Sequence, residues 1–126
     1  MANKRFEELE VWKKSAQLCA NIFIFFNTKN YFELKNQICR SALSISSNIA
    51  EGFERGSDRE FIRFLIYAKG SCGELRSQSY IGIKIKYIDS TTGNKWIQNS
   101  IEISSMLSGL IKTRRYFLKQ NITKKK

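Results

Sequence analysis

The sequence predicts an all-α protein, an antiparallel up-down-up-down four-helix bundle formed by a single domain of 126 residues. Three observations predict this fold. The chain contains no proline, and proline is the residue that most often interrupts a helix. Its 42% hydrophobic and 13% aromatic residues are sufficient for a packed core. Apolar residues recur at intervals of three and four along four segments, as on one face of a helix.

The first predicted helix runs from Phe6 to Phe26 and carries two adjacent apolar stripes. Such a wide apolar face indicates contact with more than one neighbouring helix. A turn is expected over Asn27–Phe32, where the spacing breaks down. The second predicted helix follows from Leu34 to Phe53, with the same helical spacing.

The boundary between the second and third helices carries the most specific local signals. Gly56 can adopt the left-handed conformation that ends a helix. Ser57 followed by Glu60 matches a capping box, in which each side chain accepts a hydrogen bond from the other residue's backbone amide. The two helices are therefore expected to be antiparallel and joined by a tight turn, with the third helix continuing through Gly82.

The stretch Ile81–Tyr87 (IGIKIKY) alternates apolar and other residues with the period of a strand. A single strand in a helical chain would leave its backbone groups unpaired, so the stretch is interpreted as the end of the third helix. Asp89–Asn94 is expected to form a turn, and the fourth helix to run from about Lys95 to Lys119. Residues 119–126 are expected to form a frayed basic tail.

The chain carries 22 basic and 11 acidic residues, a formal net charge of +11. This excess suits a polyanion, either nucleic acid or an anionic membrane surface. RNA or DNA, bound through sequence-independent contacts with phosphate, is the expected partner, and no membrane partner is expected. A lysine-rich solvated surface is the alternative. Tyr116 is the best candidate for stacking on a base. The residues expected to contact nucleic acid are Lys84, Lys86, Lys112, Arg114, Arg115 and Lys119.

Acids, an amide and arginines are interleaved along the second and third helices. They are expected to pair with one another along the seam between these helices and to fix their register. The alternative is a ligand pocket bounded by Asn48, Glu51 and Arg55. The expected members of this polar network are Arg40, Asn48, Glu51, Arg55, Glu60, Arg63 and Glu74.

No catalytic, cofactor or metal site is expected from the sequence. The chain has no histidine, and no activated nucleophile accompanies its acids. Gly70, Gly73 and Gly82 lack the spacing of a phosphate loop and are interpreted as sites of close helix packing. The three cysteines have the apolar neighbours of buried free thiols. Without a signal peptide or a membrane-spanning stretch, the protein is expected in the cytoplasm.

Three motifs carry a resemblance to a known family. They are F-x-x-L-x-V-W from Phe6 to Trp12, S-N-I-A-E-G-x-x-R from Ser47 to Arg55, and E-F-x-x-F-L-x-x-A-x-G-S-x-x-E-L-x-x-Q from Glu60 to Gln78. The chain resembles the bacterial four-helix-bundle, or 23S rRNA intervening-sequence, protein family over nearly its whole length. The resemblance implies an antiparallel four-helix bundle that assembles as a ring-shaped homopentamer. It implies no catalytic residues, since none are established for the family.

Distantly similar pentameric bundles act as accessory proteins that contact nucleic acid and a reverse transcriptase. A nucleic-acid-processing protein therefore joins the expected partners. These features predict a non-enzymatic, self-assembling accessory or scaffold protein that associates with nucleic acid, RNA in particular, without a cofactor. The alternative is a structural homo-oligomer that binds a protein partner and has no role on nucleic acid. A small-molecule binder at the polar network is a third hypothesis.

Overall fold

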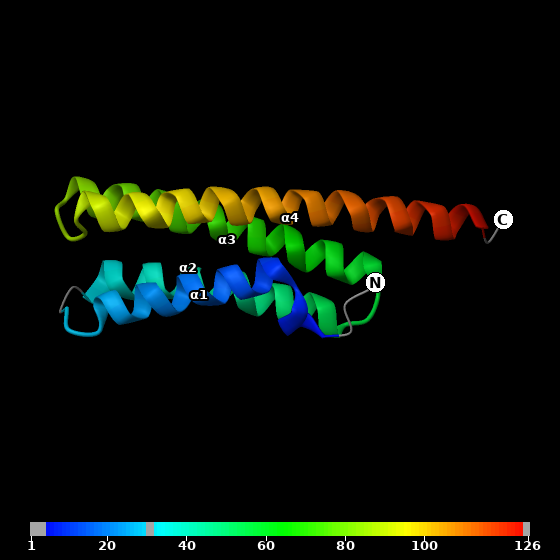
Figure 1. The fold of residues 1–126 in the computed structure, drawn as a ribbon, viewed down its shortest axis with the longest axis horizontal. Coiled ribbons are helices and arrows are strands. Elements are labelled where there is room, and N and C mark those ends of the chain that lie inside the picture. Colours follow the sequence, from blue (N-terminus) through cyan, green and yellow to red (C-terminus); the bar gives the residue numbers. More distant parts are fainter. Residues whose placement is uncertain (1–4, 30–31, 125–126) are drawn as a thin grey trace.

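The computed structural model describes residues 5–29 and 32–124. The chain forms helices α1 (Glu10–Phe26), α2 (Phe32–Glu54), α3 (Asp58–Lys84) and α4 (Ser90–Lys124), preceded by a short 3₁₀ helix, η1 (Phe6–Glu8). All four long helices follow one common axis (Figure 1), and the described residues include no strand. The predicted all-α four-helix bundle is confirmed.

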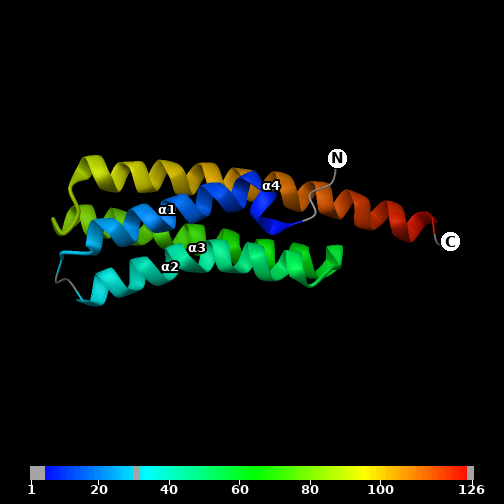
Figure 2. The same cartoon turned by 60° about the horizontal axis from the view of Figure 1, so that its bottom comes forward.

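Consecutive helices are antiparallel neighbours, and α1 also contacts α4, which closes the bundle. Figure 1 and Figure 2 both show that the C-terminal part of α4 projects beyond the ends of the other three helices. Arg114 of α4 contacts Asp58 in the first turn of α3. At 1.5 Å per residue, the ten residues from Arg115 to Lys124 therefore extend about 15 Å past that contact.

The core is one continuous cluster of apolar side chains supplied by every helix. Ile22 of α1, Ile45 of α2, Leu65 of α3 and Leu107 of α4 are fully buried within it. These residues belong to the repeats of three and four, and their burial is the main source of stability. The periodicity of the sequence therefore identifies the inward face of each helix, except at Phe23 and Phe117, which have the same spacing but are each 46% exposed.

The first helix begins at Glu10 and not at Phe6. Leu9 has an extended backbone, with φ −72° and ψ 126°, and separates η1 from α1. The ring of Phe6 packs edge-on against Trp12, with 5.2 Å between the ring centroids. Apolar spacing alone cannot reveal this break, because Phe6, Leu9 and Trp12 still bury their side chains on the same side of the molecule.

The turn between α2 and α3 follows the predicted signals closely. Gly56 has a φ of +80°, and the Ser57 hydroxyl accepts a hydrogen bond from the Glu60 amide at 3.2 Å. The predicted helix stop and helix start are confirmed. Only half of the capping box forms, however, because the Glu60 carboxylate binds Arg55 and Arg63.

The stretch Ile81–Tyr87 is helical only as far as Lys84, so its assignment to the third helix is wrong beyond that residue. The Lys86 amide donates to the Ile83 carbonyl and the Tyr87 amide to the Gly82 carbonyl. Lys86 itself has a φ of +64°. These bonds form a Schellman motif, which ends a helix with one left-handed residue. That residue is ordinarily glycine, and the lysine here hides the stop from sequence analysis.

The fourth helix begins at Ser90, and the prediction of a turn over Asp89–Asn94 is wrong. The Asp89 carboxylate accepts a hydrogen bond from the Thr92 amide at 2.9 Å, so this polar stretch caps and opens the helix. A Cβ atom at Gly93 would lie 2.5 Å from the Ile83 side chain, so glycine permits the close approach of α3 and α4 here. At its other end α4 continues to Lys124, past the expected end at Lys119.

Candidate functional site

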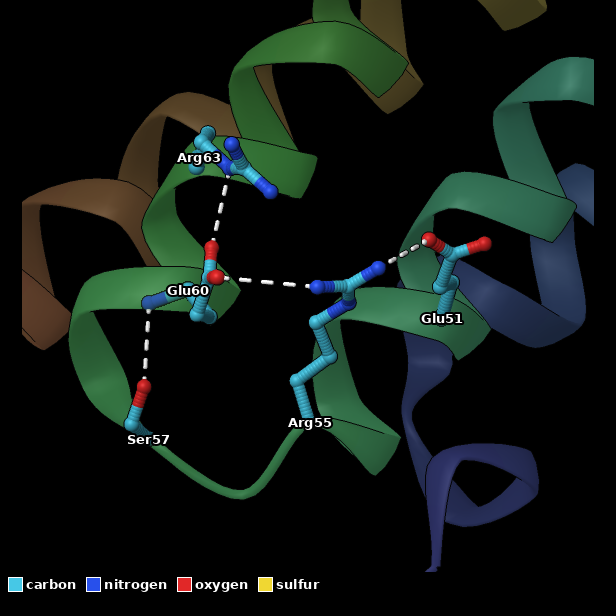
Figure 3. Close-up of polar contacts among 5 residues, drawn as sticks. All are labelled: Glu51, Arg55, Ser57, Glu60 and Arg63. Atoms are coloured by element: carbon cyan, nitrogen blue, oxygen red, sulfur yellow. Dashed lines mark hydrogen bonds and ion pairs between the residues drawn. The ribbon is translucent and has the colours of Figure 1, made fainter.

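Four members of the expected polar network form a chain of ion pairs at the turn between α2 and α3 (Figure 3). Arg55 lies 3.1 Å from Glu51 and 3.6 Å from Glu60, and Arg63 lies 2.9 Å from Glu60. The guanidinium group of Arg55 thus bridges the end of α2 to the start of α3. These side chains are 34–55% exposed, so the network lies at the surface and is not buried.

The remaining members of the expected network lie elsewhere. The Asn48 amide donates to the carbonyl and the hydroxyl of Ser44, whose hydroxyl lies 2.8 Å from that of Ser71. Arg40 and Glu74 are exposed, and neither forms an ion pair within residues 5–29 and 32–124. The prediction of a single network of seven residues is therefore wrong, since only four of them pair with one another. Because Asn48 and Arg55 bond to different partners, the structure gives no support to a shared ligand pocket there.

Among the charged residues of the C-terminal part of the chain, all are basic. Residues 103–126 contain seven lysines and arginines and no acidic residue, since Glu102 is the last acid in the sequence. Three of these cations, Lys112, Arg115 and Lys119, are exposed. At about 100° per residue they lie within about 60° of one another around the helix axis. We call these three residues the basic row.

A groove of about 440 Å³ runs beside the basic row, between α3 and α4. Its walls combine aliphatic side chains with cations from both helices. Ile111 forms a floor that is only 6% exposed, while Ile66 is 44% exposed. The lining residues are Ile66 and Lys69 of α3 and Ser108, Ile111, Lys112 and Arg115 of α4.

Arg114, which was expected to contact nucleic acid, makes its contacts inside the molecule. It lies about 100° around α4 from Arg115. Its guanidinium group lies 3.4 Å from the Asp58 carboxylate, 6.0 Å from the ring centre of Phe61 and 5.7 Å from that of Phe117. Its Nε atom is buried and has no hydrogen-bond partner among the residues that the structure describes. Arg114 thus holds α4 against the first turn of α3.

Lys84 and Lys86 lie far from the basic row. Lys84 is the last residue of α3 and Lys86 lies in the following turn, and both are exposed. This turn is at the end of the bundle opposite to the projecting part of α4 (Figure 1). The six expected nucleic-acid contacts therefore divide into two separate places and one internal ion pair.

The cysteines are free and buried, as expected: Cys19, Cys39 and Cys72. Burial raises the pKa of the Cys72 thiol to about 12, although Lys69 and Arg76 partly oppose this effect. Burial also raises the pKa values of Cys19 and Cys39. A thiol with a raised pKa stays protonated near neutral pH and is a poor nucleophile.

The described residues lack a cluster of metal ligands and a helix that could span a membrane. No three histidine, cysteine, aspartate or glutamate side chains within residues 5–29 and 32–124 are grouped as metal ligands would be. No helix in the described part of the chain is both long and apolar enough to cross a membrane.

Sequence reasoning missed Lys69 and the Asp58–Arg114 pair. A helical projection of α4 separates Arg114 from the basic row, so this signal was available in the sequence. The contribution of Lys69 was not, because it depends on how α3 and α4 pack. Lys69 and Lys112 line the same groove although they come from different helices.

Residues 7–109 match the family described as 23S rRNA-intervening sequence protein. The chain belongs to this family. The match spans most of η1, all of α1, α2 and α3, and α4 as far as Gly109. The family membership expected from the three motifs is confirmed. The basic row lies beyond the residues that match the family, so the family match itself assigns no role to it.

A solved structure supports the same conclusion. The crystal structure at 1.70 Å resolution of a protein with unknown function from the S23 ribosomal protein family of Bacteroides thetaiotaomicron VPI-5482 is similar to this family member. The two share 28% sequence identity with a TM-score of 0.76, over 81% of this chain and 98% of that one. No curated protein matches the chain significantly.

Proposed function

We propose that this protein is a non-enzymatic, self-assembling helical bundle that associates with nucleic acid in the cytoplasm, as an accessory or scaffold protein. The observation that carries the proposal is the charge of α4. After Glu102 the chain has seven basic residues and no acid, and the C-terminal part of α4 projects from the bundle. A helical segment that is rich in cations and has no acid of its own attracts a polyanion through counter-ion release, which needs no base-specific contact.

RNA is the nucleic acid that we propose first. The family to which the chain belongs takes its name from 23S rRNA. The basic row and Lys69 supply cations that can each approach one phosphate group, on either type of nucleic acid. Their contribution to binding is expected to fall steeply with salt, because each phosphate contact made releases counter-ions.

The absence of enzymatic activity is supported by the chemistry of the available groups. Histidine, the commonest general base, does not occur in the sequence. The carboxylates of Glu51 and Glu60 are engaged by arginines. Raised pKa values keep the cysteines as thiols.

Self-assembly is supported by one outward face of α3. Gly73 shares this face with the exposed side chains of Tyr80 and Ile81. A Cβ atom at Gly70 or Gly73 would meet no atom within 4 Å, so the close packing expected at these two glycines does not occur within the chain. Glycine inside a helix costs about 1 kcal/mol relative to alanine. Contact with a helix of a second copy would offset that cost, and a homopentamer is the assembly that we propose.

Binding is tested by fluorescence anisotropy with a labelled RNA at salt concentrations from low to physiological. We expect affinity to fall with salt and to be lost in the variant Lys112→Glu/Arg115→Glu/Lys119→Glu. The matched control, Lys84→Glu/Lys86→Glu/Lys95→Glu, makes the same charge change near the other end of α4 and is expected to keep most of the affinity. Absent or salt-insensitive binding would contradict the proposal.

Assembly is tested by light scattering with absorbance at 260 nm recorded in parallel. The proposal predicts a mass five times that of the chain and co-purifying nucleic acid at low salt. The alternative function, a structural homo-oligomer that binds a protein, is favoured by the exposed Tyr80 and Ile81. It predicts the same assembly without nucleic acid at any salt concentration.

A further inference from the structure

We propose that the groove between α3 and α4 binds single-stranded nucleic acid. An unpaired base rests on Ile66 and Ile111, and the phosphates on either side contact Lys69, Lys112 and Arg115. This inference rests on the proposed function and narrows it, from nucleic acid in general to an unpaired segment at a defined place.

The composition of the groove is the first reason. Its floor is aliphatic, and its cations come from both walls, Lys69 from α3 and Lys112 and Arg115 from α4. None of the described residues that line it carries a carboxylate. An apolar floor between cationic walls matches one nucleotide, whose planar base is weakly hydrated on its faces and whose phosphate is anionic.

The size and exposure of the groove are the second reason. A volume of about 440 Å³ is ample for a nucleobase. Both isoleucines line the groove: Ile66 is 44% exposed, whereas Ile111 is buried. A base that covers both side chains removes this apolar surface from water, which is favourable. A duplex cannot make that contact, because its base faces are already stacked and only its phosphates reach the protein.

Tyr116 provides a second contact for the same strand. Around the α4 axis the basic row lies between Ile111 on one flank and Tyr116 on the other. Tyr116 is 59% exposed, and its ring forms a T-shaped pair with Phe117, with 5.7 Å between the ring centroids. A strand that leaves the groove across the basic row reaches this ring, and stacking on an aromatic ring is the usual means of holding an unpaired base.

An acidic segment of a protein partner would also be attracted to these cations. The arrangement favours nucleic acid because flat apolar contacts, the groove floor and the Tyr116 ring, lie on both sides of the basic row. Such alternation of cations with base-sized surfaces is what a chain of nucleotides requires. The acidic protein is therefore an outcome that the experiment must separate.

The experiment compares three labelled RNA probes of equal length in anisotropy titrations with the full chain. One is single-stranded and unstructured, one is its duplex, and one is single-stranded with abasic sites in place of several bases. We expect the intact single strand to bind about tenfold more tightly than either of the others. The salt dependence of the single-stranded and abasic probes should be the same, because their phosphates are the same.

Variants locate the contacts. Ile66→Ser and Tyr116→Ala are each expected to weaken binding of the intact single strand about tenfold without changing its salt dependence. Lys69→Gln should reduce the slope of log affinity against log salt by about one. Ile101→Ser is the matched control, because Ile101 is an exposed isoleucine of α4 that does not line the groove, and it should bind like the wild type.

The outcomes separate this inference from the proposed function. If no probe binds even at low salt, the proposed function fails. Should all three probes bind equally and Ile66→Ser and Tyr116→Ala have no effect, nucleic-acid association stands and the groove site is overturned. Displacement of the single strand by an acidic peptide at lower concentrations than unlabelled RNA also overturns it and indicates a protein partner.

Discussion

The guanidinium group of Arg114 lies 3.4 Å from the carboxylate of Asp58, which is 56 residues earlier in the chain. This ion pair joins the last third of α4 to the first turn of α3. It is partly shielded, since the Arg114 side chain is 33% exposed and that of Asp58 is 23% exposed. It also turns one arginine of the basic end away from the surface.

We predict that Asp58→Ala lowers the free energy of unfolding by about 1–2 kcal/mol. The substitution removes the carboxylate from a guanidinium group whose Nε atom already lacks a partner. Urea unfolding of Asp58→Ala, Arg114→Met and the double variant measures the coupling. A coupling energy near zero would show that the pair is incidental. Arg114→Met should bind RNA like the wild type, whereas Arg115→Met should bind it more weakly.

Arg55 is predicted to stabilise the turn between α2 and α3. It pairs with Glu51 and Glu60 and lies 4.7 Å from the ring centre of Phe64. Exposed ion pairs contribute little individually, so the expected loss in Arg55→Ala is about 1 kcal/mol. Thermal and urea unfolding measure it, and 1 M salt should reduce the loss. Arg59→Ala, at an exposed position in the first turn of α3, is the control and should be near neutral.

Replacement of two glycines by alanine is predicted to have opposite effects on the stability of the chain. A Cβ atom at Gly52 would lie 2.5 Å from the Phe64 Cβ, so Gly52→Ala should destabilise the chain by about 1–3 kcal/mol. At Gly70 nothing lies within 4 Å, and Gly70→Ala should stabilise the chain by about 0.5–1 kcal/mol. Urea unfolding compares the two. Equal effects would mean that the contact between α2 and α3 at Gly52 is not close.

Asp89 is predicted to make stability depend on pH. The hydrogen bond from the Thr92 amide holds the pKa of its carboxyl below the ordinary value of 3.8. Because the folded-state pKa is lowered, the charged cap stabilises the protein above pH 3.8, and this contribution is lost as pH falls through the folded-state pKa. Asp89→Asn keeps an acceptor but removes the charge. In thermal unfolding, the midpoint temperature of the wild type should be higher than that of Asp89→Asn at pH 6, and the two midpoints should be equal near pH 2.

The parts of the fold that spacing and local chemistry determine were predictable. Gly56 and Ser57 mark the α2–α3 boundary because their own backbone and side chain end one helix and begin the next. The α3–α4 boundary was missed because Lys86, which takes the left-handed position, is not a residue that favours it. Its conformation is imposed by the surrounding turn, where Ile88 is buried against Gly82.

Which residues share a site could be predicted only by considering both how far along the helix axis a residue lies and which face of the helix it occupies. Arg40 lies on α2 and Arg55 directly follows the last residue of that helix, and the fifteen residues between them span about 22 Å, so the two side chains cannot contact one another or the same partner. The basic row follows from helical spacing alone. The groove beside it does not, because Lys69 and Lys112 are brought together by the antiparallel packing of α3 and α4.

The projection of α4 gives the molecule an asymmetric distribution of charge along its long axis. Residues 103–126 carry seven basic side chains and no acidic one, out of a net charge of +11 for the chain. The C-terminal part of α4 lies at one end of an elongated body. Near a polyanion such a body experiences a torque that turns its cationic tip forward before any contact is made. Diffusing molecules should therefore arrive end-on, and ionic strength should govern their orientation on arrival as well as how long they stay.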